Sequence, residues 1–90
     1  MCLSATVLTL PGCGPCTAVK AALASFGVPF EELDVSTDPD AEAMLRQLYE
    51  RRAGQRPATP VTMLATPEGM ETIYGADIRG HLKRWATVAA

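Results

Sequence analysis

The sequence predicts a small single-domain α/β protein in which short strands alternate with helices. Three observations predict it: a length of 90 residues, a hydrophobic fraction of 48%, and apolar patterning that changes between strand-like runs and helical spacing. The predicted order is strand, helix, strand, helix, strand, strand, helix. A strand–helix–strand unit pairs its strands in parallel, whereas a short turn between strands makes an antiparallel hairpin. We therefore expect a four-stranded mixed sheet flanked by helices on both faces.

The first strand and helix are predicted on either side of a Pro-Gly turn. Residues 5–10 are rich in β-branched and apolar side chains, which is typical of a short buried strand. From Cys13 to Phe26, apolar residues recur every three or four positions and alanines fill many of the others. Gly27 is a natural stop for this helix.

The second strand and helix follow directly. Residues 30–35 form the second predicted strand, which includes the apolar Phe30. Asp38 can accept hydrogen bonds from the free amides of a first helical turn, and Pro39 suits the first helical position. We expect Gly54 to end this helix. Its predicted buried stripe consists of Ala41, Met44, Leu45 and Leu48.

The last third of the chain predicts a hairpin and a final helix. After a loop at 55–60, strands are expected at 61–65 and 70–74, and the turn residues at 66–69 make them an antiparallel hairpin. Asp77 is predicted to cap the final helix. Its expected buried face consists of Ile78, Leu82 and Trp85.

Charge and hydropathy exclude several classes of protein. A net charge of −2 with only 20% charged residues argues against a nucleic-acid binder that works by bulk charge. No apolar run approaches the ~18–20 residues of a membrane span, and the N-terminus lacks the pattern of a signal peptide. We therefore expect a cytoplasmic monomer without nucleic-acid or membrane partners.

The chemistry of the chain is concentrated at residues 13–16, which read Cys-Gly-Pro-Cys at the predicted start of a helix. The free amides and dipole of a helix N-terminus stabilise a thiolate, so the pKa of Cys13 should fall below about 8.5. Cys16 lies one turn further on and can attack a mixed disulfide formed at Cys13. We expect Cys13 to be the exposed nucleophile and Cys16 the more buried resolving thiol.

A metal or iron–sulfur module is the alternative of another class. Zinc needs two ligands beyond this pair, and only Cys2 and His81 remain, far apart and without paired spacing. Such a module would need ligands from another chain or glutathione, and our first hypothesis needs no metal or cofactor. We expect Cys2 to be a free thiol, His81 a surface or packing residue, and Lys20 a solvated charge on the outer face of its helix.

From Thr6 to about Trp85 the chain resembles the thioredoxin-fold superfamily, which implies one redoxin domain over residues 1–90. The Cys-Gly-Pro-Cys motif is identical to the thioredoxin active-site motif. The sequence Thr59-Pro60 resembles the cis-proline segment, whose backbone pairs with a bound peptide or glutathione in that family. The resemblance implies that substrates contact the surface around Gly12, Thr59, Pro60 and Gly75.

Departures from thioredoxin favour the short redoxins, namely the glutaredoxin and NrdH-redoxin families. Gly12 stands where thioredoxins carry tryptophan, and Val7 stands where they carry a buried carboxylate. Leu10 replaces the basic residue of many glutaredoxins, which weakens the resemblance to a glutathione binder. In the other direction, residues 54–56 (Gly-Gln-Arg) and 75–77 (Gly-Ala-Asp) resemble glutaredoxin stretches. These make Arg56 and Asp77 candidate glutathione contacts, although the residues alone favour a solvated loop arginine at position 56.

This resemblance implies a dithiol–disulfide oxidoreductase, an electron carrier with a redox-active disulfide. Its acceptor is expected to be ribonucleotide reductase or another disulfide-containing protein. A redoxin of NrdH type is re-reduced by thioredoxin reductase, whereas a glutaredoxin is re-reduced by glutathione. The sequence favours a redoxin of NrdH type that is re-reduced by thioredoxin reductase, and it leaves re-reduction by glutathione open.

Overall fold

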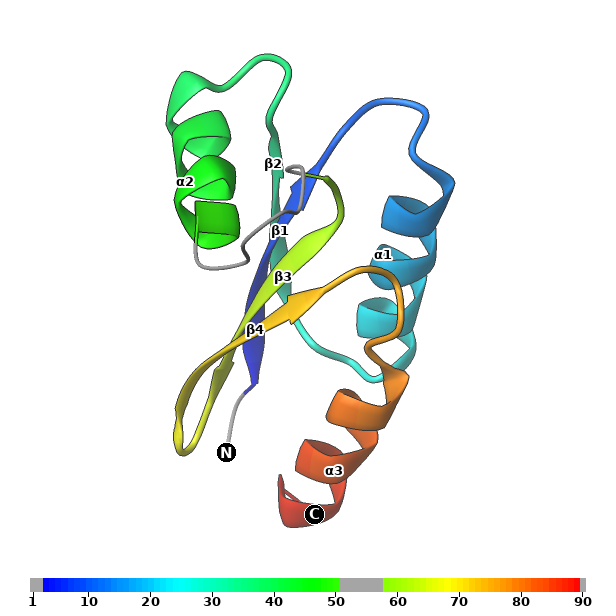
Figure 1. The fold of residues 1–90 in the computed structure, drawn as a ribbon. Helices are drawn as coiled ribbons and strands as arrows, with labels where there is room; N and C mark the ends of the chain where they lie inside the picture. The colour runs from blue at the N-terminus through cyan, green and yellow to red at the C-terminus, as the bar shows by residue number, and fades with distance from the viewer. Residues whose placement is uncertain (1–2, 51–57, 90) are drawn as a thin grey trace.

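The computed structural model describes residues 3–50 and 58–89. Its elements have the predicted order, and each predicted strand and helix is present (Figure 1). They are β1 (Ser4–Thr9), α1 (Gly14–Ser25), β2 (Phe30–Asp34), α2 (Pro39–Glu50), β3 (Val61–Thr66), β4 (Gly69–Tyr74) and α3 (Arg79–Ala89).

The four strands form one mixed sheet in the order β2-β1-β3-β4. β1 runs parallel to β2, with Thr9 opposite Asp34, and antiparallel to β3, with Leu8 opposite Val61. β3 and β4 form the predicted antiparallel hairpin. The expectation of a four-stranded mixed sheet is therefore confirmed, and β1 is one of its two inner strands.

Helices cover both faces of the sheet, with α1 and α3 on one side and α2 on the other (Figure 1). Successive residues of a strand point to opposite faces, so Val7 and Leu8 belong to different hydrophobic clusters. The cluster under α1 and α3 includes Val19, Leu23, Leu64, Ile73, Ile78, Leu82 and Trp85. The cluster under α2 consists of Leu8, Val35, Ala41, Leu45 and Val61, with Met44 and Leu48 packed against it.

Two of the predicted helix boundaries are confirmed by their local contacts. Asp38 caps α2, because its Oδ1 accepts hydrogen bonds from the amides of Asp40 at 3.0 Å and Ala41 at 3.3 Å. Gly27 follows the end of α1 with a φ of 68°, a conformation that glycine adopts without strain. The predicted stop at Gly54 lies outside the described residues.

The predicted start of α3 is wrong by one residue. The first backbone hydrogen bond of this helix runs from the amide of Leu82 to the carbonyl of Ile78, and the helix begins at Arg79. Ile78 therefore occupies the N-cap position and Asp77 lies one residue before it, exposed to solvent. The apolar spacing located the buried face of α3 correctly, but Ile78 belongs to the cap as well as to the core.

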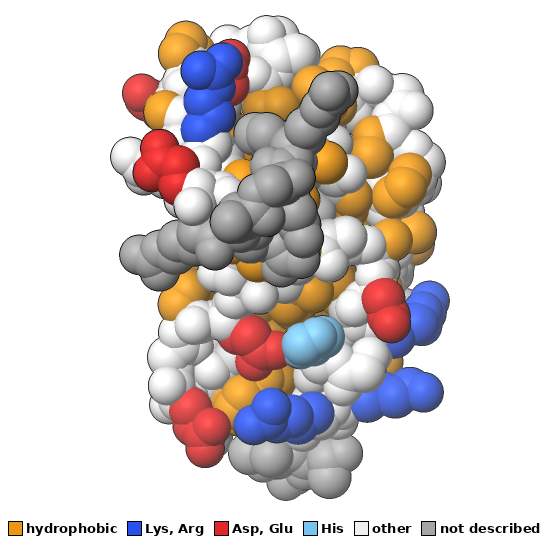
Figure 2. All heavy atoms as spheres, in the orientation of Figure 1, with side chains coloured by type: hydrophobic (Ala, Val, Ile, Leu, Met, Phe, Trp, Pro, Cys, Tyr) orange, Lys and Arg blue, Asp and Glu red, His pale blue; other side chains and the backbone are white. Residues whose placement is uncertain are grey.

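One polar cluster ties α3 to β4. Both oxygens of the Glu71 carboxylate are engaged, because Trp85 Nε1 donates to Oε2 at 3.2 Å and His81 Nδ1 contacts Oε1. Figure 2 shows the histidine side chain lying against an acidic side chain on this face. His81 is thus a surface residue that contacts Glu71. Within the described ranges, no helix is long and apolar enough to cross a membrane.

Candidate active site

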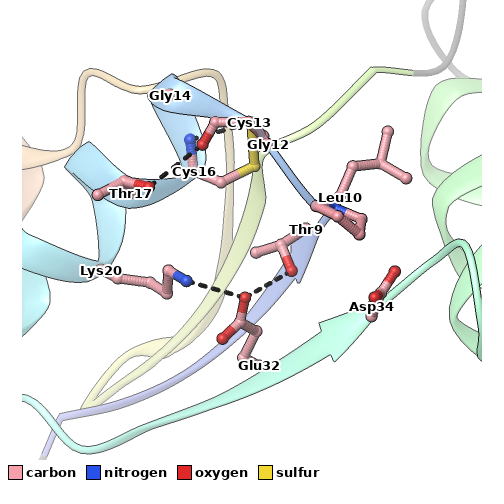
Figure 3. A pocket seen from close by; sticks show the side chains of 11 residues that line it. Thr9, Leu10, Gly12, Cys13, Gly14, Cys16, Thr17, Lys20, Glu32 and Asp34 are labelled. Carbon is pink, nitrogen blue, oxygen red and sulfur yellow. Dashed lines mark hydrogen bonds and ion pairs between the residues drawn. A yellow bond between two sulfur atoms is a disulfide. The ribbon is translucent and has the colours of Figure 1, made fainter.

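The two motif cysteines lie where β1 ends and α1 begins. After Thr9 the chain turns through Gly12, whose φ of 74° suits glycine, and α1 starts at Gly14 (Figure 3). Cys13 is the N-cap of this helix. Cys13 and Cys16 form a disulfide with a Cα–Cα separation of 5.2 Å, which lies in the ordinary range for a disulfide.

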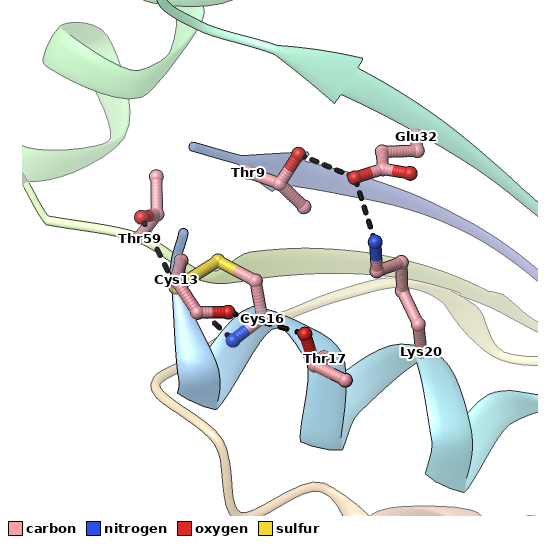
Figure 4. The surroundings of a disulfide bond; sticks show 7 residues. All are labelled: Thr9, Cys13, Cys16, Thr17, Lys20, Glu32 and Thr59. Atoms are coloured by element: carbon pink, nitrogen blue, oxygen red, sulfur yellow. Dashed lines mark hydrogen bonds and ion pairs between the residues drawn. A yellow bond between two sulfur atoms is a disulfide. The ribbon is translucent and has the colours of Figure 1, made fainter. Parts of the chain in front are cut away.

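Two hydrogen-bond donors converge on the sulfur of Cys13 (Figure 4). The amide of Cys16 donates to Sγ at 3.1 Å, and the hydroxyl of Thr59 donates to it at 3.7 Å. Free amides at a helix N-terminus, together with the helix dipole, favour negative charge. The same donors would stabilise a thiolate at Cys13 once the disulfide is reduced.

The two sulfur-bearing residues differ in exposure. Cys13 is half-buried, whereas Cys16 is only 2% exposed. The difference follows from the helix, because Cys13 precedes its first turn and Cys16 points toward the sheet. An incoming disulfide can therefore reach Cys13 more readily than Cys16.

The segment before β3 lies against the cysteines. The peptide bond between Thr59 and Pro60 is cis, as the resemblance implies. The amide of Gly75 donates to the carbonyl of Pro60 at 3.0 Å, which brings the end of β4 to this segment. Four predicted contact residues, Gly12, Thr59, Pro60 and Gly75, thus lie on segments that meet around the disulfide.

A polar pocket of about 350 Å³ opens beside the disulfide (Figure 3). It is bounded by the start of α1 and by the ends of β1 and β2. Its lining residues are Thr9, Leu10, Pro11, Gly12, Cys13, Gly14, Cys16, Thr17, Lys20, Glu32 and Asp34.

A charged pair that the sequence did not predict forms one wall of this pocket. Lys20 Nζ donates to Glu32 Oε2 at 3.0 Å, and the hydroxyl of the buried Thr9 donates to the same oxygen at 2.8 Å. The hydrogen bonds from Lys20 and then Thr9 lower the pKa of Glu32 below its ordinary value. Glu32 therefore stays ionised at neutral pH, and the expectation that Lys20 is a solvated charge is wrong.

Asp77, another candidate from the sequence, is not among the residues that line this pocket. Asp77 borders a separate hollow on α3 with Gly80, His81 and Arg84. Arg56 and Cys2 lie outside the described residues. Leu10 borders the pocket and is 41% exposed, so an apolar side chain occupies the place where many glutaredoxins carry a cation. Among residues 3–50 and 58–89, no group of three or more His, Cys, Asp or Glu side chains could hold a metal ion.

A cysteine pair on the helix that follows the central strand, faced by a cis-proline, is the arrangement of the thioredoxin-fold redoxins. The family model of glutaredoxin matches residues 5–64, which is more than half of the chain. The chain belongs to the glutaredoxin family. It is a thiol–disulfide oxidoreductase with the Cys13–Cys16 pair as its redox-active disulfide.

Solved structures agree with this assignment. The NrdH-redoxin from Escherichia coli, described as a glutaredoxin-like protein with a thioredoxin-like activity profile, is 27% identical with a TM-score of 0.68, over 90% of this chain and 92% of that one. A mutant of the thioredoxin-like protein BC3987 is 31% identical with a TM-score of 0.63, over 90% and 96%. A glutaredoxin from Archaeoglobus fulgidus shares the fold at 18% identity, with a TM-score of 0.64 over 90% and 83%. No curated protein matches the chain.

Proposed function

We propose that the protein is a dithiol electron carrier of NrdH-redoxin type, which reduces protein disulfides and is itself reduced by thioredoxin reductase. The observation that carries this proposal is the asymmetry of the cysteine pair. The sulfur of the half-buried Cys13 accepts hydrogen bonds from Cys16 and Thr59, while Cys16 is buried at 2% exposure. Such a pair suits a nucleophile that meets the substrate and a thiol that resolves the product.

In the proposed cycle, the Cys13 thiolate attacks one sulfur of the substrate disulfide. The other substrate sulfur leaves as a thiolate, takes a proton from water, and a mixed disulfide remains at Cys13. Cys16 then loses its proton to solvent and attacks Cys13 Sγ, which breaks the mixed disulfide and releases the second substrate thiolate. The substrate gains the two electrons that the dithiol loses, and the Cys13–Cys16 disulfide forms.

The uncharged rim of the site supports a protein substrate and a protein donor. From Leu10 to Gly14 the chain carries no charged side chain, and Leu10 is 41% exposed. Apolar surface of this kind suits contact with another protein better than with the two carboxylates of glutathione. As in the family, the backbone of Thr59 would pair with an extended peptide of the substrate. The resemblance to NrdH-redoxins makes ribonucleotide reductase the first acceptor to test.

Glutathione is the competing donor, because the matching family model is that of glutaredoxin. Its proposed contacts would be Arg56 and Asp77. Two coupled assays separate the donors: reduction of a protein disulfide with NADPH and thioredoxin reductase, and the same reduction with glutathione and glutathione reductase. We expect turnover mainly in the first assay. Turnover in the glutathione assay alone would contradict the proposal and favour the second candidate.

Two cysteine variants test the assigned roles. Cys13→Ser should lose activity with both donors, since the variant lacks the attacking sulfur at the helix N-terminus. Cys16→Ser should stop at the mixed disulfide, which mass spectrometry of a trapped adduct would detect. Activity that survives in Cys13→Ser would show that the nucleophile is assigned wrongly. Metal analysis and visible absorbance of the purified protein test the iron–sulfur or zinc alternative in the same preparation.

A further inference from the structure

The pocket beside the disulfide contains an opposite-charge pair in addition to the two sulfur atoms. Cys13 and Cys16 line one side of this pocket, and Lys20 and Glu32 line another. Figure 4 shows the Lys20 ammonium and the Glu32 carboxylate directed toward each other to one side of the disulfide, with Thr9 between the carboxylate and the sulfurs. The pair therefore shares a polar space with the group that is oxidised and reduced.

The helix brings the lysine close to the resolving thiol. Lys20 follows Cys16 by four positions, and residues with this spacing lie on one face of a helix with β-carbons about 5–6 Å apart. Charges within the screening length of about 8–10 Å at ordinary ionic strength interact appreciably. The side chain of Lys20 is 32% exposed and that of Glu32 is 41% exposed. Solvent therefore weakens the electrostatic effect of each charge on the sulfurs without abolishing it.

The charge on the sulfurs changes during the reaction. The disulfide is neutral, whereas the reduced pair can carry a thiolate. A nearby cation stabilises the thiolate and with it the reduced form, and a nearby anion favours the disulfide. We propose, on the premise of the proposed function that Cys13 and Cys16 are the exchanging pair, that Lys20 and Glu32 set the redox equilibrium of this pair by opposing effects, Lys20 favouring the dithiol and Glu32 the disulfide.

Thr9 keeps the two opposing charges in place. Its hydroxyl and the Lys20 ammonium donate to the same oxygen of Glu32, which holds the carboxylate ionised beside the ammonium. Asp34 is the other carboxylate of the pocket, and its Oδ1 accepts from the amide and hydroxyl of Ser36 at 2.8 and 2.6 Å. Because Asp34 keeps these partners in every variant below, its influence on the sulfurs stays constant.

The test is the equilibrium between the wild-type chain, or each variant, and glutathione buffers of known ratio. Glu32→Gln leaves Lys20 without its partner, and we expect the equilibrium to move about threefold to tenfold toward the dithiol. Lys20→Met leaves the Glu32 anion without its counter-charge, and we expect a shift of similar size toward the disulfide. A tenfold change corresponds to about 30 mV in the two-electron potential. The double variant should lie within about twofold of wild type, because both charges are gone.

A second ion pair provides the matched control. On α2, Arg46 Nη2 lies 2.6 Å from Glu42 Oε1. Neither residue lines the disulfide pocket. Arg46→Met and Glu42→Gln remove the same charges, and neither should move the equilibrium measurably. The pH dependence of thiol alkylation gives an independent readout, in which Glu32→Gln should lower the thiol pKa and Lys20→Met should raise it.

Three outcomes would overturn the inference. Shifts of the same sign in Glu32→Gln and Lys20→Met would indicate a purely structural effect of the pair. Shifts no larger than those of the α2 controls would remove the electrostatic role altogether. A wild-type chain that forms no reversible disulfide between Cys13 and Cys16 would overturn the proposed function and the inference together, and the wild-type titration separates this case from the other two.

Discussion

The hydroxyl of Thr59 donates a hydrogen bond to the sulfur of Cys13 at 3.7 Å, although 46 positions separate the two residues. The contact joins the segment before β3 to the start of α1. It is possible because β1, which leads to Cys13, lies next to β3 in the sheet. A side chain from one segment therefore acts on the reactive atom supplied by another.

Replacing Thr59 with valine should raise the pKa of the Cys13 thiol. The hydroxyl would stabilise the thiolate and not the thiol, and a hydrogen bond of this length contributes about 1 kcal/mol or less. We expect the reduced protein to react about twofold to fivefold more slowly with iodoacetamide at pH 7. The rate is measured against pH in a background carrying Cys2→Ser and Cys16→Ser, so that only Cys13 reports.

Thr17→Val is the control for this substitution. Its hydroxyl donates to the backbone carbonyl of Cys13 at 3.3 Å, not to the sulfur, and the amide of Thr17 donates to the same carbonyl at 3.2 Å. Loss of this hydroxyl should leave the alkylation profile nearly unchanged. Equal effects of the two substitutions would show that the direct contact of Thr59 with the sulfur does not matter.

Local patterns in the sequence sufficed for the element order and for the cysteine pair. Strand and helix periodicities are properties of neighbouring residues, and the motif is contiguous, so both could be predicted without knowing the fold. The Thr59 segment was accessible only through the resemblance, because nothing local indicates which cysteine it faces. The cap of α3 was misplaced because Ile78 also reads as a core residue.

The contact between Thr9 and Glu32 could not be predicted because it depends on strand register. Thr9 lies opposite Asp34, so Glu32, two residues earlier, is its diagonal neighbour on the same face. A shift of one residue would turn Glu32 to the other face of the sheet. The sequence shows an acidic residue in a strand and a lysine on a helix, but only the register brings them to one pocket.

Glu71 should stabilise the protein in a pH-dependent way. Partial burial alone would raise the pKa of Glu71, but the hydrogen bonds from His81 and Trp85 outweigh it and lower the pKa below the ordinary value of 4.5. A carboxyl whose pKa is lower in the folded state contributes stability above its unfolded pKa and loses it as the pH falls through the folded value. Wild type should therefore exceed Glu71→Gln by about 1 kcal/mol at neutral pH, and the difference should shrink below about pH 4.5.

Urea unfolding at several pH values, followed by Trp85 fluorescence, measures this difference. Trp85 is 4% exposed in the folded protein and becomes solvated on unfolding. Glu68→Gln, in the exposed turn before β4, is the control and should show no such pH dependence. A stability gap for Glu71→Gln that stays constant down to pH 3 would contradict the ionic role of this carboxylate.

The cap of α2 gives a prediction that is independent of the redox site. Asp38→Ala removes the acceptor of two first-turn amides and should lower the free energy of unfolding by about 1 kcal/mol. Asp38→Asn keeps an oxygen acceptor at this position and should restore most of the loss. The measurement is urea unfolding at neutral pH, and an asparagine variant as unstable as the alanine variant would show that the cap acts through charge instead.

Thr62 should make the protein less stable than an isosteric apolar residue would. It is fully buried on the face of β3 that packs under α1 and α3, between Val7 and Ile73, and its hydroxyl has no hydrogen-bond partner among the residues that the structure describes. A buried hydroxyl without a partner costs about 1–3 kcal/mol of desolvation, whereas valine has nearly the same shape. Thr62→Val should therefore raise the free energy of unfolding by about 1 kcal/mol, measured as a higher urea midpoint at constant slope.

Thr66→Val is the control and should lower the free energy of unfolding. The hydroxyl of Thr66 donates to the carbonyl of Gly69 at 2.6 Å and accepts from the amide of Glu68 at 3.2 Å. If Thr62→Val destabilised the protein as Thr66→Val does, the hydroxyl of Thr62 would have a hydrogen-bond partner in solution. Its burial would then not carry the desolvation cost expected from its position.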